Sequence, residues 1–250
     1  MEIDGVDAAR NCPRAGFWRR WIAFLIDYLV VYVPIGALAA LLFSMTAGSV
    51  QMTSGIFRAC TSSNQIPQEL SPAPPQNANF AVLCRVQFFG LETGRVLTVG
   101  RSVREGAVTK TISQGYMIDA VGKPISGFDL SWFLLIALVA YFVALFSLTG
   151  KSIGALAMRM TLVDRSTPSI PGAPLSKVLL RYLAMTIGLL PLLAVAAFYG
   201  IGGASIEALF IPLVIAGALG GVWAIVLAIQ IATKRDPLYD TLAGTAILKD

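Results

Sequence analysis

Histidine is absent from all 250 residues of the sequence. Histidine is the commonest general base, proton shuttle and transition-metal ligand in proteins, so its absence excludes every catalytic triad that contains it. The three cysteines form neither a CxxC pair nor a set with zinc-ligand spacing. We therefore expect no metal site and no cofactor and, because no nucleophile is paired with a base, no enzyme.

Charged residues are also scarce, at 13% of the chain, whereas hydrophobic residues make up 56%. This composition is typical of a membrane protein, because a soluble fold would leave much of that apolar surface in water. The net charge of +5 comes without a basic face or a recognition motif. We therefore expect the lipid bilayer as the surroundings of the chain and no nucleic acid as a partner.

Four apolar stretches are long enough to cross a bilayer, which needs roughly 20 residues in helical form. The first stretch carries an acid in its interior, Asp27, and the third carries Arg181 within its first turn. The third and fourth stretches are joined by a short turn, 201–207, and should be antiparallel neighbours. The predicted transmembrane helices are 21–43, 130–148, 178–200 and 208–232.

Lysine and arginine near the ends of these stretches predict the topology, because short loops rich in them stay in the cytoplasm. They cluster in the N-terminal tail, 1–20, in the segment 149–177 and in the C-terminal tail, 233–250. All three clusters fall on one side, so we expect both termini in the cytoplasm and the chain in the inner (plasma) membrane. The first stretch is too long for a signal peptide and should stay uncleaved.

The long segment 44–129 differs from the rest of the chain in composition. It contains a proline-rich connector, PQELSPAPPQNANF, which cannot be helical. Three β-like runs with glycine-containing turns between them follow: AVLCRVQFF, GRVLTVGRSV and AVTKTISQGYMIDAV. The sequence thus predicts an all-α membrane protein of four transmembrane helices, with a small extracytoplasmic β-rich insertion, an antiparallel meander, between the first two helices.

Two of the three cysteines, Cys60 and Cys84, fall in this external segment. In an oxidising space they are expected to pair, and a disulfide that closes a loop of this size stabilises a fold by roughly 3 kcal/mol. The alternative of two independent buried thiols stays open, because the sequence does not reveal connectivity. Cys12 lies on the reducing side and should remain a free thiol.

Arg20 and Asp27 are seven residues apart, almost two helical turns, and share one face of the first helix. Ala23, between them, leaves that face open to close approach by another helix. Asp27 lies about 10 Å along the axis from Arg20 and therefore inside the hydrocarbon, where a carboxylate needs a partner or a proton. The candidate partners are Arg20 and Arg181. A transport role and a structural ion pair that fixes helix register both explain these residues.

The segment after the second helix contains GKS, which superficially resembles a phosphate-binding loop. Such a loop needs a glycine five positions before Gly150, where this chain has Leu145, and a buried strand before it. We therefore reject nucleotide binding and expect residues 152–158 to lie in the membrane interface. Gly217 and Gly221 have GxxxG spacing and predict a close helix contact, either with the third helix or in a dimer.

Four sequence motifs occur in a fixed order: AGFWRRWIAFLID, TGKSIGALAMRMTLVD, LLRYL and DPLYDTLAGTAILKD. Together they resemble the RDD family of membrane proteins. The resemblance implies that the family's one arginine and two aspartates are Arg20, Asp27 and Asp240. Tyr239 departs from the pattern, because many members are similar to HD at this place. The resemblance also implies a transport role, since some members are described as sodium/proton exchangers.

Two functions follow as expectations. In the first, the chain is a small secondary transporter or cation/proton exchanger that handles an inorganic cation or small solute. Opposing pKa effects of neighbouring carboxylates and arginines would then exchange a proton for a cation. In the second, it is a non-transporting adaptor or assembly protein that binds another copy or a membrane protein through its external loop or helix faces. The charged cluster expected to carry either role is Arg20, Asp27, Arg181 and Asp240.

Overall fold

The computed structural model describes residues 14–63, 66, 70–106, 108–202, 206–233 and 235–249. Cys12, expected to be a free thiol, and part of the predicted turn 201–207 lie outside the described residues. The chain divides into two compact units. The first comprises the described parts of Met1–Tyr28 and Val139–Asp250, and the second comprises those of Leu29–Leu138.

Within the described residues, four helical segments are long and apolar enough to cross a membrane, as the hydropathy of the sequence predicts. Helix α2 begins earlier than expected, because FWRR continues the helical pattern before the apolar stretch. Helices α2 and α7 contain Pro34 and Pro212, respectively, and continue through them. The four segments are Phe17–Met45 (α2), Ser131–Leu148 (α3), Leu175–Phe198 and Phe210–Ala232, the last within α7, Ile206–Ala232.

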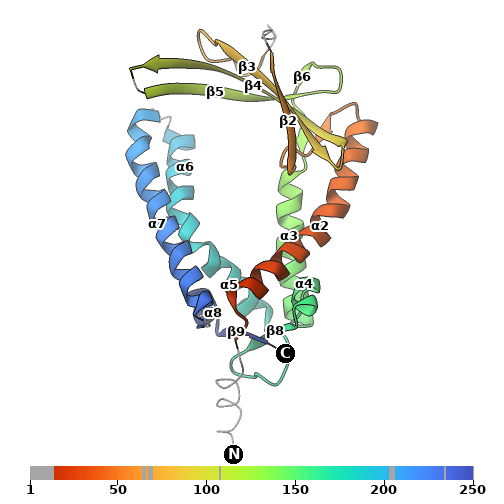
Figure 1. Ribbon diagram of the computed structural model, residues 1–250, viewed down its shortest axis with the longest axis vertical. Coiled ribbons are helices and arrows are strands. Elements are labelled where there is room, and N and C mark those ends of the chain that lie inside the picture. The colour runs from red at the N-terminus through yellow and green to blue at the C-terminus, as the bar shows by residue number, and fades with distance from the viewer. Residues whose placement is uncertain are drawn as a thin grey trace, which may run out of the picture. The chain divides into compact units, whose positions relative to one another are not determined.

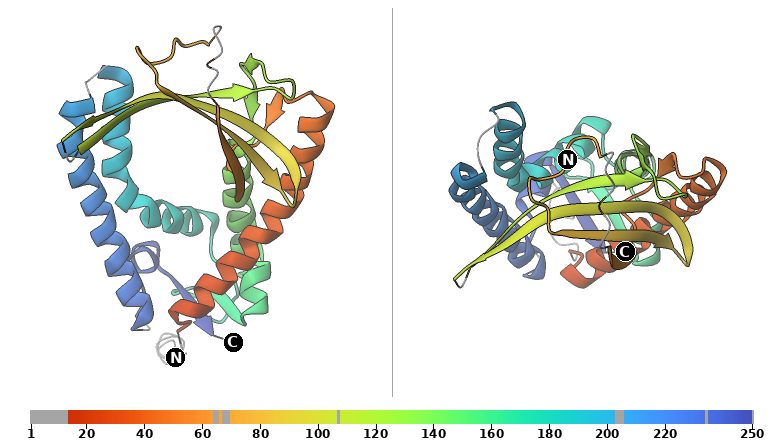
Figure 2. Two further views of the ribbon diagram at one scale, coloured as in Figure 1. Left: turned by 45° about the horizontal axis from the view of Figure 1, so that its top comes forward. Right: turned by 90° about the horizontal axis from the view of Figure 1, so that it is seen from above.

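The third apolar segment, which the sequence predicted as a helix over 178–200, is interrupted. It consists of α5 (Leu175–Met185), the 3-10 turn η1 (Thr186–Leu189) and α6 (Leu190–Gly202). Pro191 lacks the N–H that would bond to the carbonyl of Ile187, which accounts for the break in the hydrogen-bond ladder. The Trp223 indole in α7 donates to the Met185 carbonyl at 3.3 Å. Helices α6 and α7 run side by side (Figures 1 and 2).

Glycines in α7 contact the broken segment at a different place from the predicted one. A Cβ at Gly220 would lie 2.8 Å from the Gly188 carbonyl oxygen, so two glycines allow the close approach. A Cβ at Gly217 or Gly221 would meet nothing within 4 Å. The GxxxG pair therefore does not make the contact with the third segment that the sequence suggested.

The prediction of an all-α fold is wrong, because 49% of the chain is helical and 27% is strand. The second unit contains a curved five-stranded antiparallel sheet in the order β2-β3-β4-β5-β6 (Figure 2). The expected meander corresponds to its three central strands, of which β4 is longer than the run that predicted it and β5 is shorter. The strands are β2 (Phe57–Ser63), β3 (Phe80–Phe88), β4 (Leu91–Glu105), β5 (Val108–Ile118) and β6 (Pro124–Ile125).

Strand β2 precedes the proline-rich connector and was not predicted. It pairs with β3 in a register that places Cys60 directly opposite Cys84. The two cysteines form a disulfide, which confirms the expected pairing and excludes two separate thiols. A small parallel pair, β1 (Val50–Gln51) with β7 (Phe128–Asp129), lies in the same unit.

The segments 149–177 and 233–250 contain secondary structure that the sequence did not reveal. In the first unit they pair as two antiparallel strands, β8 (Met160–Asp164) and β9 (Thr245–Lys249). Short helices precede both strands: α4 (Ile153–Ala157) and α8 (Leu238–Ala243). Gly244 ends α8 in the left-handed conformation (φ 66°), which allows a sharp turn into β9. Asp240, within α8, lies against Arg20 of α2 and Arg181 of α5.

Candidate functional site

Asp27 lies on α2 with 2% of its surface exposed, as a buried carboxylate should. Its Oδ1 accepts hydrogen bonds from the Tyr141 hydroxyl and from the Gly154 backbone N–H, both at 2.7 Å. Its Oδ2 accepts one from the Ser152 hydroxyl at 2.6 Å. Three donors therefore surround the carboxylate, and they satisfy the negative charge without a cation.

The same contacts attach helix α4 to α2. Ser152 is the N-cap of α4, where its side chain accepts from Ala155 N at 3.1 Å. Asp27 accepts the next free N–H, that of Gly154, at the positive end of the helix. Ala23 allows the approach, as its small side chain predicted, because Gly154 packs against the Ala23 carbonyl. Asp27 thus fixes the segment that follows α3.

Replacing Gly154 by alanine tests this close contact. A Cβ at residue 154 would overlap the Ala23 carbonyl oxygen and lie 2.8 Å from the Asp27 carboxylate. We expect the Gly154→Ala variant to lose about 1–3 kcal/mol of stability, as overpacked sites do. The matched control is Gly217→Ala in α7, where a Cβ meets nothing within 4 Å. Equal thermal unfolding midpoints for the two variants in detergent would contradict the proposed packing.

Asp240 lies on α8 with none of its side chain exposed, and two arginines share it. Its Oδ2 is 3.0 Å from Arg20 Nη1 on α2, and its Oδ1 is 2.7 Å from Arg181 Nη1 on α5. The Thr245 hydroxyl at the start of β9 donates to Oδ1 at 3.1 Å. One carboxylate therefore joins α2, α5 and the C-terminal segment.

The neighbouring Tyr239 completes this cluster. The Arg181 guanidinium lies 5.2 Å from the centre of the Tyr239 ring, in cation–π geometry, and Arg20 Nη1 donates to the Tyr239 hydroxyl at 3.4 Å. Burial raises the pKa of Tyr239, and Asp240 adds to this effect while Arg181 opposes it. The phenol is therefore neutral at physiological pH and supplies no compensating charge.

The arginine cluster carries more positive than negative charge. Arg20 and Arg181 are paired with the single carboxylate of Asp240, and their side chains are 10% and 7% exposed. Arg20 Nη2 and Arg181 Nε are buried and have no hydrogen-bond partner among the described residues. The cluster is thus short of acceptors, and loss of its one carboxylate would leave two buried cations.

The structure groups the four predicted residues differently from the sequence hypothesis. Arg20, Arg181 and Asp240 meet, whereas no described arginine forms an ion pair with Asp27. The expected arginine partner of Asp27 is therefore wrong, and hydroxyl and amide groups take that place.

Three residues of the site were missed by sequence reasoning: Tyr141, Ser152 and Gly154. The serine had a signal, because Ser152 precedes the short apolar run that forms α4 and serine is a preferred N-cap. The other two had none, since a tyrosine inside an apolar helix and one glycine among many have no distinctive spacing. In the described residues, no group of three or more Cys, Asp or Glu side chains is arranged to hold a metal.

A separate ion pair fastens β8 to the start of α5. Lys177 Nζ lies 2.6 and 2.7 Å from the two carboxylate oxygens of Asp164. Burial alone would raise the pKa of Asp164, but Lys177 and Ser166 lower it below its ordinary value. The stabilisation is therefore present above the unfolded pKa, about 3.9, and is lost as the pH falls through the folded pKa.

The lowered pKa of Asp164 predicts how the stability of the chain depends on pH. The wild-type chain should unfold at a higher temperature than the Asp164→Asn variant at pH 7, because the variant lacks the Lys177 ion pair. The difference between the two unfolding midpoints should shrink as the pH falls below about 4, because the unfolded wild-type chain then binds a proton that the folded, ion-paired carboxylate resists. Scans from pH 7 to pH 3 measure it, and a difference that stays constant over this range would contradict the assignment.

Comparison with known proteins identifies the family of the chain. No curated protein and no solved structure matches the chain. A family model does match, the RDD family, over residues 14–244, which is essentially the whole chain and includes all four site residues. Together with its four apolar helices, this match makes the chain a multi-pass membrane protein. The chain belongs to the RDD family.

Proposed function

We propose that the chain is a small secondary transporter, a cation/proton exchanger, in which Asp27 carries the exchanged proton. One observation carries the proposal: a carboxylate on a membrane-spanning helix is buried and bonded to two hydroxyls and one amide. Ionisable groups inside membranes are costly and mark ion pathways by default. The hydroxyls of Tyr141 and Ser152 are able to pass a proton to and from the carboxylate.

The arginine cluster has a different role in this proposal. Asp240 holds α2, α5 and α8 together through Arg20 and Arg181, and so fixes the helix that carries Asp27. The interruption at η1, between α5 and α6, supports a transport function, because discontinuous helices are common in secondary transporters. The orientation with both termini in the cytoplasm of the inner membrane is part of the proposal and rests on the basic residues near the span ends.

Reconstituted protein tests the function. Purified chain is placed in liposomes that contain a pH-sensitive dye and hold an imposed pH gradient, and sodium or potassium chloride is then added outside. We expect the wild-type protein to dissipate the pH gradient when the salt of the transported cation, either sodium or potassium, is added. We expect the Asp27→Asn variant to lose at least about nine-tenths of this rate, because an amide cannot exchange a proton in this pH range.

The control for this assay is Asp119→Asn, at an exposed carboxylate that bonds the Val121 and Lys123 backbone amides in a turn of the second unit. Its rate should equal that of the wild type. Size-exclusion profiles of both variants show whether the protein is folded before reconstitution. A wild-type rate in folded Asp27→Asn protein would end the exchanger proposal.

A second function, a non-transporting adaptor, is favoured by one feature of the sheet unit. Residues 108–115 of β5 are exposed on both faces, and β6 pairs only with Met117 and Ile118. That edge of β5 is open to a strand from a partner. Deleting 101–113, the β4–β5 hairpin beyond the reach of β3, should then abolish partner recovery in a pull-down. Transport by purified, partner-free monomer would rule against the adaptor.

A further inference from the structure

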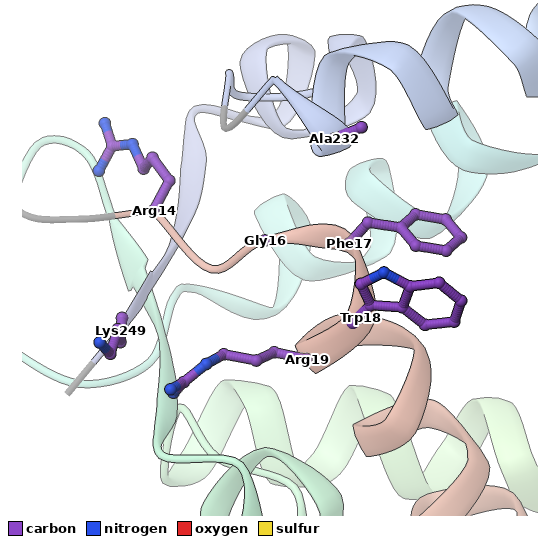
Figure 3. A pocket seen from close by; sticks show the side chains of 7 residues that line it. All are labelled: Arg14, Gly16, Phe17, Trp18, Arg19, Ala232 and Lys249. Atoms are coloured by element: carbon purple, nitrogen blue, oxygen red, sulfur yellow. The ribbon is translucent and has the colours of Figure 1, made fainter.

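A pocket of about 480 Å³ lies where α2 begins, in the first unit (Figure 3). Arg14, Arg19 and Lys249 supply three cationic side chains to its lining, and Phe17 and Trp18 supply two aromatic rings. The described residues of the lining include no carboxylate. The pocket is distinct from the Asp27 and Asp240 contacts described above, and none of its side chains belongs to them.

The electrostatics of the pocket favour an anion. The first turn of α2 contains no acidic residue, so the positive end of this 29-residue helix adds to the charge of the side chains. Arg14 Nε is 3.1 Å from an Asp236 oxygen, which neutralises part of its charge. Arg19 Nη1 donates to the Met158 carbonyl at 3.2 Å, a contact with no negative charge. Among the described residues, neither Arg19 nor Lys249 forms an ion pair with an acid, so two cations of the pocket keep their charge.

The opposite side of the pocket is apolar. Figure 3 shows the rings of Phe17 and Trp18 on one side and the charged ends of Arg14, Arg19 and Lys249 on the other. Trp18 is 70% exposed and contacts Trp21, which is 50% exposed. Ala232, also in the lining, is the last residue of the apolar helix α7. Exposed tryptophans at the ends of spans mark the membrane–water interface.

We propose that this pocket binds the phosphate headgroup of an anionic phospholipid from the adjoining leaflet. Arg19, Lys249 and the free amides at the start of α2 hold the phosphate, and Phe17 and Trp18 pack against the glycerol and the first acyl carbons. A dissolved phosphate ion would contact only the cationic side chains and would make no contact with the aromatic rings. A phospholipid carries a charged phosphate next to apolar carbons, which matches the cationic side and the adjoining aromatic side of the pocket.

The test measures thermal unfolding of the purified full-length chain in a zwitterionic detergent. The probes are dioctanoyl phosphatidylglycerol, dioctanoyl phosphatidylcholine and sodium phosphate, each added in increasing concentration. We expect phosphatidylglycerol to raise the unfolding midpoint with saturation, at a half-effect concentration at least tenfold below that of phosphatidylcholine. Sodium phosphate should have no comparable effect.

Two double variants separate the pocket from general surface charge. Arg19→Gln/Lys249→Gln leaves the Arg14–Asp236 pair in place and should lose the tenfold preference for phosphatidylglycerol. Arg159→Gln/Arg235→Gln removes two exposed basic residues outside the pocket and should keep the tenfold preference for phosphatidylglycerol. Lys249→Gln alone, at an exposed position, serves if the double variant does not fold, and should show a reduced preference. An unchanged preference in the pocket variants, an equal loss in the control, or an equal effect of sodium phosphate would overturn the proposal.

Discussion

Replacing Asp240 by asparagine is expected to lower the free energy of unfolding by about 3–5 kcal/mol, the cost of removing one partner from a buried ion pair. The variant would leave Arg20 and Arg181 buried and charged, with an amide in place of their shared carboxylate. The cluster already has unpaired guanidinium nitrogens, so no spare acceptor is present among the described residues to take over. The measurement is chemical or thermal unfolding of purified protein in detergent, with expression yield as a second readout.

Asp236 provides a matched control for this prediction. It also pairs with two arginines, Arg14 and Arg165, at 3.1 and 2.9 Å, but its side chain is 17% exposed and that of Arg165 is 34% exposed. Pairs that water reaches contribute about 0–1 kcal/mol. Asp236→Asn should therefore cost less than Asp240→Asn, because water reaches its Arg165 pair. If the two variants were equally stable, burial would not be what makes the Asp240 pairs strong.

Removing the side chain of Asp27 is expected to have a comparable effect for a different reason. Asp27→Ala leaves a backbone amide and two hydroxyls without their acceptor, and a buried unsatisfied donor costs about 1–3 kcal/mol. The hydroxyl of Ser152 and the amide of Gly154 are fully buried with it. We expect the free energy of unfolding to fall by about 3 kcal/mol or more in total. We also expect α4 to lose its attachment to α2.

Asparagine at the same position keeps one acceptor oxygen, so Asp27→Asn should lose less stability than Asp27→Ala. This order is what allows the asparagine variant to report on transport rather than on folding. Asp119→Ala, at an exposed turn, is the control for side-chain removal. Unfolding midpoints in the order wild type, Asp27→Asn, Asp27→Ala support the structural role, and an alanine variant as stable as the wild type would contradict it.

The sequence was sufficient for the features that depend on local composition. Apolar runs of span length predicted the four helices, because only a helix satisfies its backbone polar groups in lipid. Alternating β-branched residues predicted strands β3, β4 and β5, and two cysteines in one segment predicted the disulfide. The family motifs singled out Arg20 and Asp240, and the position of Asp240 just beyond the fourth apolar stretch predicted that the two would meet.

The errors lie where distant residues decide the structure. The fold class was wrong because counting apolar stretches gave the strands too little weight, and because β8 and β9 exist only as a pair, more than 80 residues apart. The predicted partner of Asp27 was wrong because an isolated carboxylate in a membrane helix suggests a cationic partner. In the structure, two hydroxyls and a backbone N–H at a helix N-terminus donate hydrogen bonds to the carboxylate instead. The break at η1 had a signal in Pro191, but α7 continues through Pro212, so a proline alone does not predict an interruption.

The most direct test of the proton-carrying role of Asp27 is chemical modification with a membrane-soluble carbodiimide, followed by peptide mass mapping. Such reagents react with protonated carboxyl groups that lie in apolar surroundings. We expect Asp27 in reconstituted wild-type protein to be modified, and we expect less modification at higher pH or in the presence of the transported cation. Transport should be lost in proportion to the fraction of Asp27 that is modified. Full-rate transport by protein whose Asp27 is quantitatively modified would contradict it.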